Sequence, residues 1–188
     1  MTTAASVGGS ERPRLFVALL LPTAAVQQLT RWQAEAFAGL RDVRIVPDAN
    51  LHVTVAFLGH RPAAEVGPIT EALRASAAAH VGRIELSVSR YRETRSVGMV
   101  AFDDAGGRAA AFAADLHGRL EQLDVYERER RRWLAHVTVL RFRRRPRLEP
   151  SLPDLGEVCP SEAAVYHSVL RPTGAQYEIV ESVPLGAD

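Results

Sequence analysis

The sequence has a single cysteine and no long apolar run. Cys159 is the only cysteine among 188 residues, which excludes an internal disulfide and a metal site built from several thiolates. We therefore expect a reducing, cytoplasmic setting. No stretch of about 18 apolar residues occurs, so no transmembrane helix is predicted and no membrane partner is expected. The apolar residues 15–21 have only the length of a strand, with no signal cleavage pattern after them.

Lysine is absent as well. All 23 basic residues are arginines, and with 22 acidic residues the formal net charge is only +1. The arginines are unevenly distributed, with one cluster at Arg128 and residues 130–132 and another at Arg141, residues 143–145 and Arg147. Two interpretations of these clusters stay open, because a charged run is usually a solvated surface but can also follow an RNA backbone.

A four-residue phrase occurs twice in the chain. His-Val-Thr-Val stands at residues 52–55 and again at residues 136–139, 84 positions further along. In both copies apolar residues alternate with His and Thr, which is the pattern of a half-buried strand. We therefore predict two strands that each carry a histidine and a threonine on one face. A single copy would indicate little, since strands favour threonine and most lone histidines are structural.

The hydrophobic pattern of the whole chain predicts pairs of strands separated by three helices. We expect residues 1–13 to be a disordered leader and residues 14–188 to form a single bilobal domain. Because the strands come in adjacent pairs, we predict an α+β fold in which two mostly antiparallel sheets face each other across a central cleft with pseudo-twofold symmetry, with the helices packed outside. Strands are expected at 14–21, 43–46, 51–59, 84–89, 96–102, 135–142, 165–170 and 177–183, with an irregular stretch at 146–161. Helices are expected at 26–38, at 68–80 and after Gly106 and Gly107, the last with Phe112, Leu116, Leu120 and Leu123 on its buried stripe.

Two histidines that face each other across a cleft suit a reaction in which one proton is removed and another is delivered. Imidazole has a pKa near ~6.5, so near neutrality one ring can act as a base and the other as an acid. The threonine hydroxyls beside them are suited to hold the oxygens of a tetrahedral anion such as phosphate. A nucleophilic triad and a metal site fit less well, because the chain has no G-x-S-x-G and no H-E-x-x-H. We interpret the remaining histidines as solvent-exposed or capping residues: His60, His80, His117 and His167.

These residues carry a resemblance to a known family. The segments LHVTVAFLG (51–59) and AHVTVLRF (135–142) resemble the two H-x-T-x signatures of the RNA 2′,3′-cyclic phosphodiesterases, also called 2′-5′ RNA ligases, of the two-histidine phosphoesterase superfamily. The flanks resemble the same family at RLFVALLLP (14–22), VPDANLHVT (46–54) and YHSVLRPTGAQYEIV (166–180). The resemblance covers almost everything after residue 13.

The resemblance implies a reaction and roles for five residues. The family opens a terminal 2′,3′-cyclic phosphate to a 2′-phosphate without a metal or another cofactor, and 2′-5′ ligation is the reverse reaction. By motif position His52 would be the proton donor to the departing 3′ oxygen, and His136 the proton acceptor that activates water. Thr54 and Thr138 would hold the non-bridging phosphate oxygens, and Arg141 matches the substrate-binding arginine. In the ligating direction the roles of the two histidines would exchange.

Strand alternation makes a different prediction for two residues. Arg141 should share a face with Val137 and Val139, opposite His136, so that it reaches the cleft only if a bulge intervenes. Phe57 should likewise point into the core, although in the cleft it would be placed to stack on a base.

Three functions are consistent with these residues. The first is the RNA 2′,3′-cyclic phosphodiesterase, which we expect to act as a monomer on RNA that ends in a cyclic phosphate. The second is an enzyme of the same superfamily whose substrate is a small cyclic nucleotide or an ADP-ribose cyclic phosphate. The third is a noncatalytic module that binds RNA ends, against which the two complete His-x-Thr pairs speak.

Overall fold

The structure, a computed structural model, describes residues 12–80, 82–171 and 174–186. Residues 1–11 of the predicted leader lie outside the described residues. The carbonyls of Arg12 and Pro13 accept hydrogen bonds from His60 Nδ1 and from the backbone N–H of Arg61. The strands are β1 (Arg14–Leu20), β2 (Val43–Ile45), β3 (His52–His60), β4 (Leu86–Glu93), β5 (Val97–Asp103), β6 (His136–Phe142), β7 (Glu157–Val158), β8 (Glu162–Arg171) and β9 (Gly174–Pro184). The helices are α1 (Thr23–Ala36), α2 (Val66–Ala79) and α3 (Arg108–Gln122), with single 3₁₀ turns η1 (Asp48–Asn50) and η2 (Ala63–Glu65).

The strands of the described chain form one antiparallel sheet that divides into two lobes. Its order is β7-β4-β5-β6-β3-β1-β8-β9, with β2 beside β6. The repeated strands β3 and β6 are the two central ones, and they pair only at Val53 and Val137. That single pair joins a first lobe (β3, β1, β8, β9) to a second lobe (β6, β5, β4, β7, β2). The predicted α+β, mostly antiparallel fold is confirmed, and the two sheets of the prediction meet at this one point.

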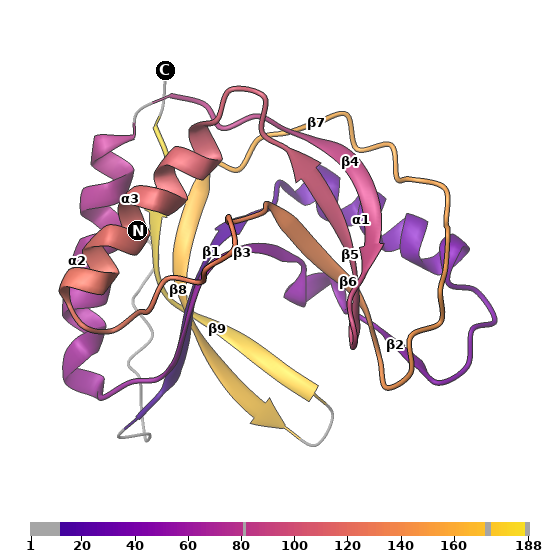
Figure 1. Cartoon of the computed structure of the whole chain (residues 1–188), viewed down its shortest axis with the longest axis horizontal. Coiled ribbons are helices and arrows are strands. Elements are labelled where there is room, and N and C mark those ends of the chain that lie inside the picture. Colours follow the sequence, from indigo (N-terminus) through magenta and orange to yellow (C-terminus); the bar gives the residue numbers. More distant parts are fainter. Residues whose placement is uncertain (1–11, 81, 172–173, 187–188) are drawn as a thin grey trace.

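Each lobe is covered on its outside by helices. Figure 1 shows α2 and α3 side by side against the first lobe at one end of the molecule and α1 against the second lobe at the other. Two of the three helices cross to the lobe opposite the strand that precedes them: α1 follows β1 of the first lobe and covers the second, whereas α3 follows β5 of the second lobe and covers the first. The units β1-α1-β3 and β5-α3-β6 are thus exchanged copies of each other, which gives the fold its pseudo-twofold symmetry.

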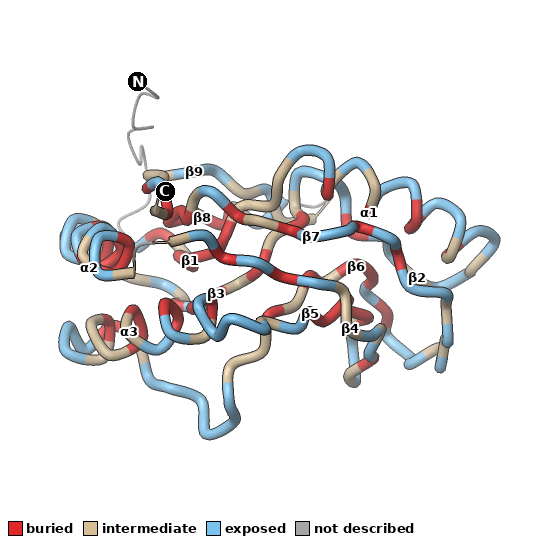
Figure 2. The backbone as a smooth tube through the Cα atoms, turned by 90° about the horizontal axis from the view of Figure 1, so that it is seen from above, coloured by how far each residue is buried: buried red, intermediate tan, exposed pale blue. Residues whose placement is uncertain are grey.

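Apolar stripes fix the helices on the sheet. Phe112, Leu116 and Leu120 of α3 are completely buried, and burial of each such side chain stabilises the fold by roughly 1.5 to 3 kcal/mol. Figure 2 shows buried residues along the strands and on the sides of α2 and α3 that face them. The fourth residue of the predicted stripe, Leu123, is 40% exposed because the helix ends at Gln122 and the chain turns away.

The other elements follow the predicted order with shifted bounds. Pro68 lies in the first turn of α2, as predicted, and the antiparallel pairing of β4 with β5 is confirmed. The stretch 146–161 contains the two-residue strand β7, which pairs with β4. The final hairpin, β8 and β9, is longer than its apolar pattern indicated, because its exposed outer residues continue the pairing.

Candidate active site

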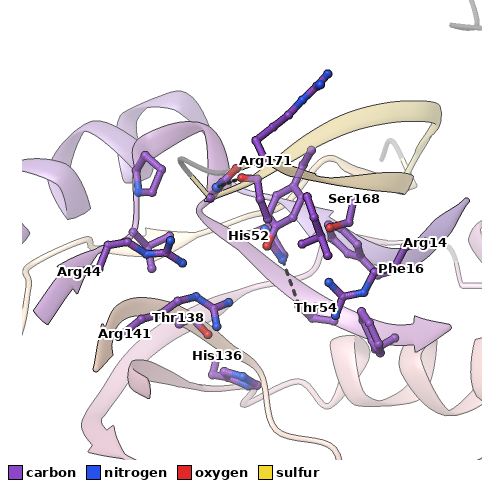
Figure 3. Close-up of a pocket in the computed structure, with 18 residues that line it drawn as sticks. Arg14, Phe16, Arg44, His52, Thr54, His136, Thr138, Arg141, Ser168 and Arg171 are labelled. Carbon is purple, nitrogen blue, oxygen red and sulfur yellow. Dashed lines mark hydrogen bonds between the residues drawn. The ribbon is translucent and has the colours of Figure 1, made fainter. Parts of the chain in front are cut away.

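The two repeated strands place their polar residues in one cavity. His52 and Thr54 on β3 and His136 and Thr138 on β6 are half-buried, while the valines between them are buried in the core. Figure 3 shows the two pairs on opposite walls of the cavity, whose volume is about 440 Å³. The cavity is lined by residues of both lobes: Arg14, Phe16, Arg44, Val46, Pro47, Asn50, His52, Thr54, Phe57, His136, Thr138, Arg141, Ser168, Leu170, Arg171, Gly174, Ala175 and Tyr177.

A β-bulge on each central strand interrupts the alternation. On β3, Val17 of β1 pairs with Ala56 and the next residue, Ala18, pairs with Thr54, so that Val55 has no partner on β1. A bulge of this kind inserts one extra residue and shifts the parity of everything after it. Val55 and Ala56 are both buried, and Phe57 emerges on the face of His52 with 51% of its surface exposed. The prediction that Phe57 points into the core is therefore wrong.

The same bulge recurs at the equivalent place on β6. Gly98 of β5 pairs with Leu140 and Met99 pairs with Thr138, so that Val139 is left without a partner on β5. Arg141 consequently lines the cavity instead of facing the core with Val137 and Val139. Strict alternation fails here because a bulge intervenes, which is the condition under which Arg141 was expected to reach the cleft. Val55 and Val139 are 84 positions apart, as are Phe57 and Arg141, so the repeat extends beyond its four letters.

A buried polar side chain binds the carbonyl of each bulged valine. Gln33 of α1 donates from Nε2 to the Val139 carbonyl at 2.8 Å and also approaches the Val46 carbonyl at 3.1 Å. His117 of α3 donates from Nε2 to the Val55 carbonyl at 2.8 Å. Gln33 and His117 are 1% and 5% exposed, and they too lie 84 positions apart. The interpretation of His117 as solvent-exposed or capping is wrong: it completes the hydrogen bonding of a bulge.

His136 has its tautomer fixed by the backbone. Its Nδ1 lies 2.8 Å from the carbonyl oxygen of Leu134. A carbonyl only accepts, so Nδ1 carries the proton and the neutral ring keeps a lone pair on Nε2. This arrangement prepares His136 to accept a proton at Nε2.

His52 is set among aromatic rings. The ring centroids of Phe16, Tyr177 and Tyr166 lie 4.9, 5.3 and 6.0 Å from that of His52, and Tyr166 also stacks on Phe16 at 4.9 Å. Burial among these rings lowers the pKa of His52 to about 4, and the positive charges of His136 and Arg141 lower it further, while a hydrogen bond to the Asn50 backbone opposes the shift. His52 Nε2 is 3.1 Å from Thr54 Oγ1 (Figure 3).

The cavity is lined by cations that have no acidic partner among the described residues. Its described lining residues include Arg14, Arg44, Arg141 and Arg171 but no aspartate or glutamate. Arg14 places its guanidinium carbon 4.8 Å from the centre of the Phe57 ring. Such a lining attracts an anion. It contains no described carboxylate that could act as an acid, a base or a nucleophile.

The two arginine clusters lie mostly outside this cavity. Arg141 is the one member of either cluster that lines it, all of them being described. Arg145 instead pairs at 3.0 Å with Glu93, whose side chain is buried and also accepts from the backbone N–H groups of Arg147 and Leu148. Arg128 contacts Glu121 and the Ala114 carbonyl. Arg145 and Arg128 therefore make contacts within the protein itself.

Several residues that line the cavity or surround His52 were not found from the sequence. Phe16, Tyr166 and Tyr177 surround His52, but the alternation that would reveal the orientation of Phe16 is hidden in an all-apolar strand. Arg44 stands on a strand of only three residues, too short to show a pattern.

The described residues offer neither a metal site nor a helix that could span a membrane. Within residues 12–80, 82–171 and 174–186, no group of three or more His, Cys, Asp or Glu side chains is arranged to hold a metal ion. No helix in the same part of the chain is long and apolar enough to cross a membrane.

Comparison with known proteins places the fold. Residues 19–95 match the family of LigT-like phosphoesterases, whereas no curated protein gives a significant match. Among solved structures, Escherichia coli LigT complexed with phosphate superposes with a TM-score of 0.77 at 20% identity, over 95% of this chain and 100% of that one. LigT complexed with 3′-AMP gives a TM-score of 0.75 at 21% identity, over 94% and 99% of the two chains. TT0787 of Thermus thermophilus gives 0.76 at 26% identity, over 93% and 100%. The predicted resemblance to two-histidine phosphoesterases is confirmed.

Proposed function

We propose that this LigT-like phosphoesterase opens RNA 2′,3′-cyclic phosphate ends to 2′-phosphomonoesters by acid and base catalysis with its two histidines. The observation that carries the proposal is the convergence of both His-x-Thr pairs and Arg141 on one cavity whose described lining contains no carboxylate. The ligands of E. coli LigT, phosphate and 3′-AMP, are of the chemical class that the proposal requires.

The hydrolytic step divides between the two walls. His136 Nε2 takes a proton from a water molecule, whose oxygen attacks the phosphorus. The bond from phosphorus to the 3′ oxygen breaks, and His52 Nε2 delivers a proton to that oxygen, leaving a 3′ hydroxyl and a 2′-phosphate. Each proton transfer typically contributes ~10² to 10⁴ in rate. Thr54, Thr138 and Arg141 bind the non-bridging oxygens, on which negative charge increases.

The donor role requires His52 to hold a proton that burial disfavours in the free protein. The pKa of His52 is lowered to about 4 by burial first and then by the charges of His136 and Arg141. A phosphate anion between the walls counters both repulsions and favours the imidazolium, so substrate binding itself raises the pKa. His52 therefore becomes an acid in the complex, in front of the oxygen that it protonates.

A small cyclic phosphodiester is the second candidate substrate. The cavity volume of about 440 Å³ lies in the range of small-molecule sites and accommodates about one nucleotide. The chemistry is the same, and only the part of the substrate outside the cavity differs.

Product analysis tests the proposal. Purified protein is incubated with an oligonucleotide that ends in a 2′,3′-cyclic phosphate, with and without excess chelator. We expect the 2′-monophosphate in both cases, because the protein side chains supply the proton transfers and the positive charge. Release of the 3′-monophosphate, or loss of turnover with chelator, would contradict the proposal. Tight salt-dependent binding without turnover would instead support the noncatalytic module.

A further inference from the structure

Arg44 occupies an unusual position beside the site. It is the direct cross-strand partner of Arg141 in the antiparallel pair of β2 and β6. Directly opposed residues of such a pair project from the same face of the sheet, and like charges there destabilise it. Both side chains line the cavity, and Figure 3 shows them extending from neighbouring strands on the wall that carries His136 and Thr138.

No acidic residue in the part of the chain that the structure describes relieves this repulsion. Among the described residues, neither Arg44 nor Arg141 has a carboxylate within salt-bridge distance, and the lining contains none. The two other lining arginines are arranged differently: Arg14 lies over the Phe57 ring, and Arg171 points out of the cavity in Figure 3. A paired set of guanidinium groups at this place is therefore suited to anions supplied by the ligand.

Arg44 also extends across the mouth of the cavity toward the first lobe. Its Nη1 lies 3.1 Å from the point that a Cβ atom on Gly174 would occupy, at the start of β9. The glycine leaves room for the guanidinium group between the lobes. Arg44 is exposed and lines the cavity, so that a part of a ligand that extends out of the cavity beside it can reach its guanidinium group.

The charge of the substrate indicates what Arg44 binds. A cyclic phosphodiester carries one negative charge, which Arg141 and the two threonine hydroxyls already meet. Arg44 lies on the neighbouring strand, roughly 5 Å from Arg141, and its charge is not met by this one anion. A second anion on the ligand would neutralise it. We propose that Arg44 binds the 5′ phosphate of the nucleotide whose cyclic phosphate is opened. This deepens the proposed function and rests on it: the substrate class becomes cyclic-phosphate nucleotides that carry a 5′ phosphate, as the last nucleotide of an RNA chain does.

Three substrates and three variants test the assignment. The substrates are a nucleoside 2′,3′-cyclic phosphate, the same compound with a 5′ phosphate, and a dinucleotide with a cyclic end. The variants are Arg44→Gln, Arg141→Gln and, as a matched control, Arg41→Gln, which removes the same charge from an exposed residue that does not line the cavity. Thermal unfolding of each variant checks that it is folded.

We expect the 5′ phosphate to raise kcat/KM roughly tenfold in the wild type, as a charge-assisted hydrogen bond can. Arg44→Gln should abolish this preference. For the dinucleotide, it should also reduce the slope of log kcat/KM against log salt concentration by about 1, the contribution of one phosphate contact. Arg141→Gln should lower turnover of every substrate and keep the ratio, and Arg41→Gln should change neither. A dinucleotide favoured over the 5′-phosphorylated mononucleotide would place further chain contacts in addition to Arg44.

Failure of the inference differs from failure of the proposed function. If the wild type turns over the substrates but Arg44→Gln keeps the same preference as Arg41→Gln, the assignment of Arg44 is overturned alone. It is equally overturned if Arg44→Gln lowers kcat/KM by the same factor for all three substrates, because Arg44 then acts on the cyclic phosphate that they share. If the wild type turns over none of them, the proposed function is overturned and the inference with it.

Discussion

The walls built on β3 and β6 share a backbone but not an environment. Each has a histidine and a threonine, then a bulged valine, and then a residue that the bulge turns into the cavity. On β3 that residue is Phe57, and on β6 it is Arg141. His52 is enclosed by aromatic rings, whereas the ring contacts of the described residues include none for His136.

This difference gives a symmetric scaffold the means to carry out the asymmetric reaction that we propose. The proposed opening of a cyclic phosphate needs one group that gives a proton and another that takes one, and unlike surroundings favour one division of these roles between the two histidines. The repeat supplies the geometry twice, and the two histidines then differ in what surrounds them and in their hydrogen bonds. Burial acts on His52, and the carbonyl of Leu134 orients His136.

The largest expected effect is the loss of either histidine. His52→Ala and His136→Ala should each lower kcat by about 10² to 10⁴ on a cyclic phosphate. A substrate with sulfur in place of the 3′ oxygen separates them, because a thiol of pKa ~8.5 leaves without a proton donor. His52→Ala should recover most of its activity on that substrate, and His136→Ala should not. The measurement is single-turnover hydrolysis of both substrates.

The opposite result would contradict the roles assigned to the two histidines. Recovery of His136→Ala alone would exchange the donor and acceptor. Equal recovery of both, or of neither, would mean that the walls do not divide the proton transfers between them. His60→Ala is a suitable control, since His60 is exposed and does not line the cavity.

A smaller effect should appear in stability against pH. The folded protein protonates His52 only near pH 4, whereas the unfolded chain protonates it near 6.5. Between these values the unfolded state binds more protons, so stability falls as pH falls. Compared with His52→Asn, the wild type should lose up to about 3 kcal/mol of unfolding free energy between pH 7 and pH 4.

Chemical denaturation of wild type, His52→Asn and His136→Asn across that range measures the effect. The contribution of His117, whose pKa is also lowered by burial, is common to all three proteins and cancels in the differences. A constant difference between wild type and His52→Asn over the whole range would show that His52 is not held neutral by burial, and the contrast between the walls would then lose its electrostatic basis.

The sequence predicted those parts of the fold and site that have a local pattern. The repeated phrase indicated two strands with His and Thr on one face, and their flanks carried the resemblance. The sequence does not reveal the bulges, because the consecutive apolar residues of Val-Ala-Phe and Val-Leu-Arg fit a strand buried on both faces as well as they fit a bulge. A bulge depends on the register of the neighbouring strand, which is a long-range property.

The same limit applies to the residues that the sequence pattern missed or misplaced. His117 appears isolated in the sequence, and only the packing of α3 on β3 shows that it meets the Val55 carbonyl. Arg44 acquires meaning from its partner Arg141, almost a hundred residues away. Residues whose role comes from a neighbour in another element need the tertiary structure to identify them.

The smallest effect concerns Gln33 and His117, which bind equivalent bulges with different side chains. His117→Leu leaves the buried Val55 carbonyl unpaired and should cost about 1 to 3 kcal/mol of unfolding free energy. His117→Gln should restore most of this, because the protein itself uses glutamine for the equivalent bond to Val139. Gln33→Leu should in addition lower kcat/KM, by disturbing the bulge that presents Arg141. That loss should shrink in an Arg141→Gln background, since both changes act through the same side chain. Additive losses of kcat/KM in this double-mutant cycle would show that Gln33 does not act through Arg141. Gln33 and His117 would then both support a bulge for stability, and neither would contribute to presenting a cavity residue.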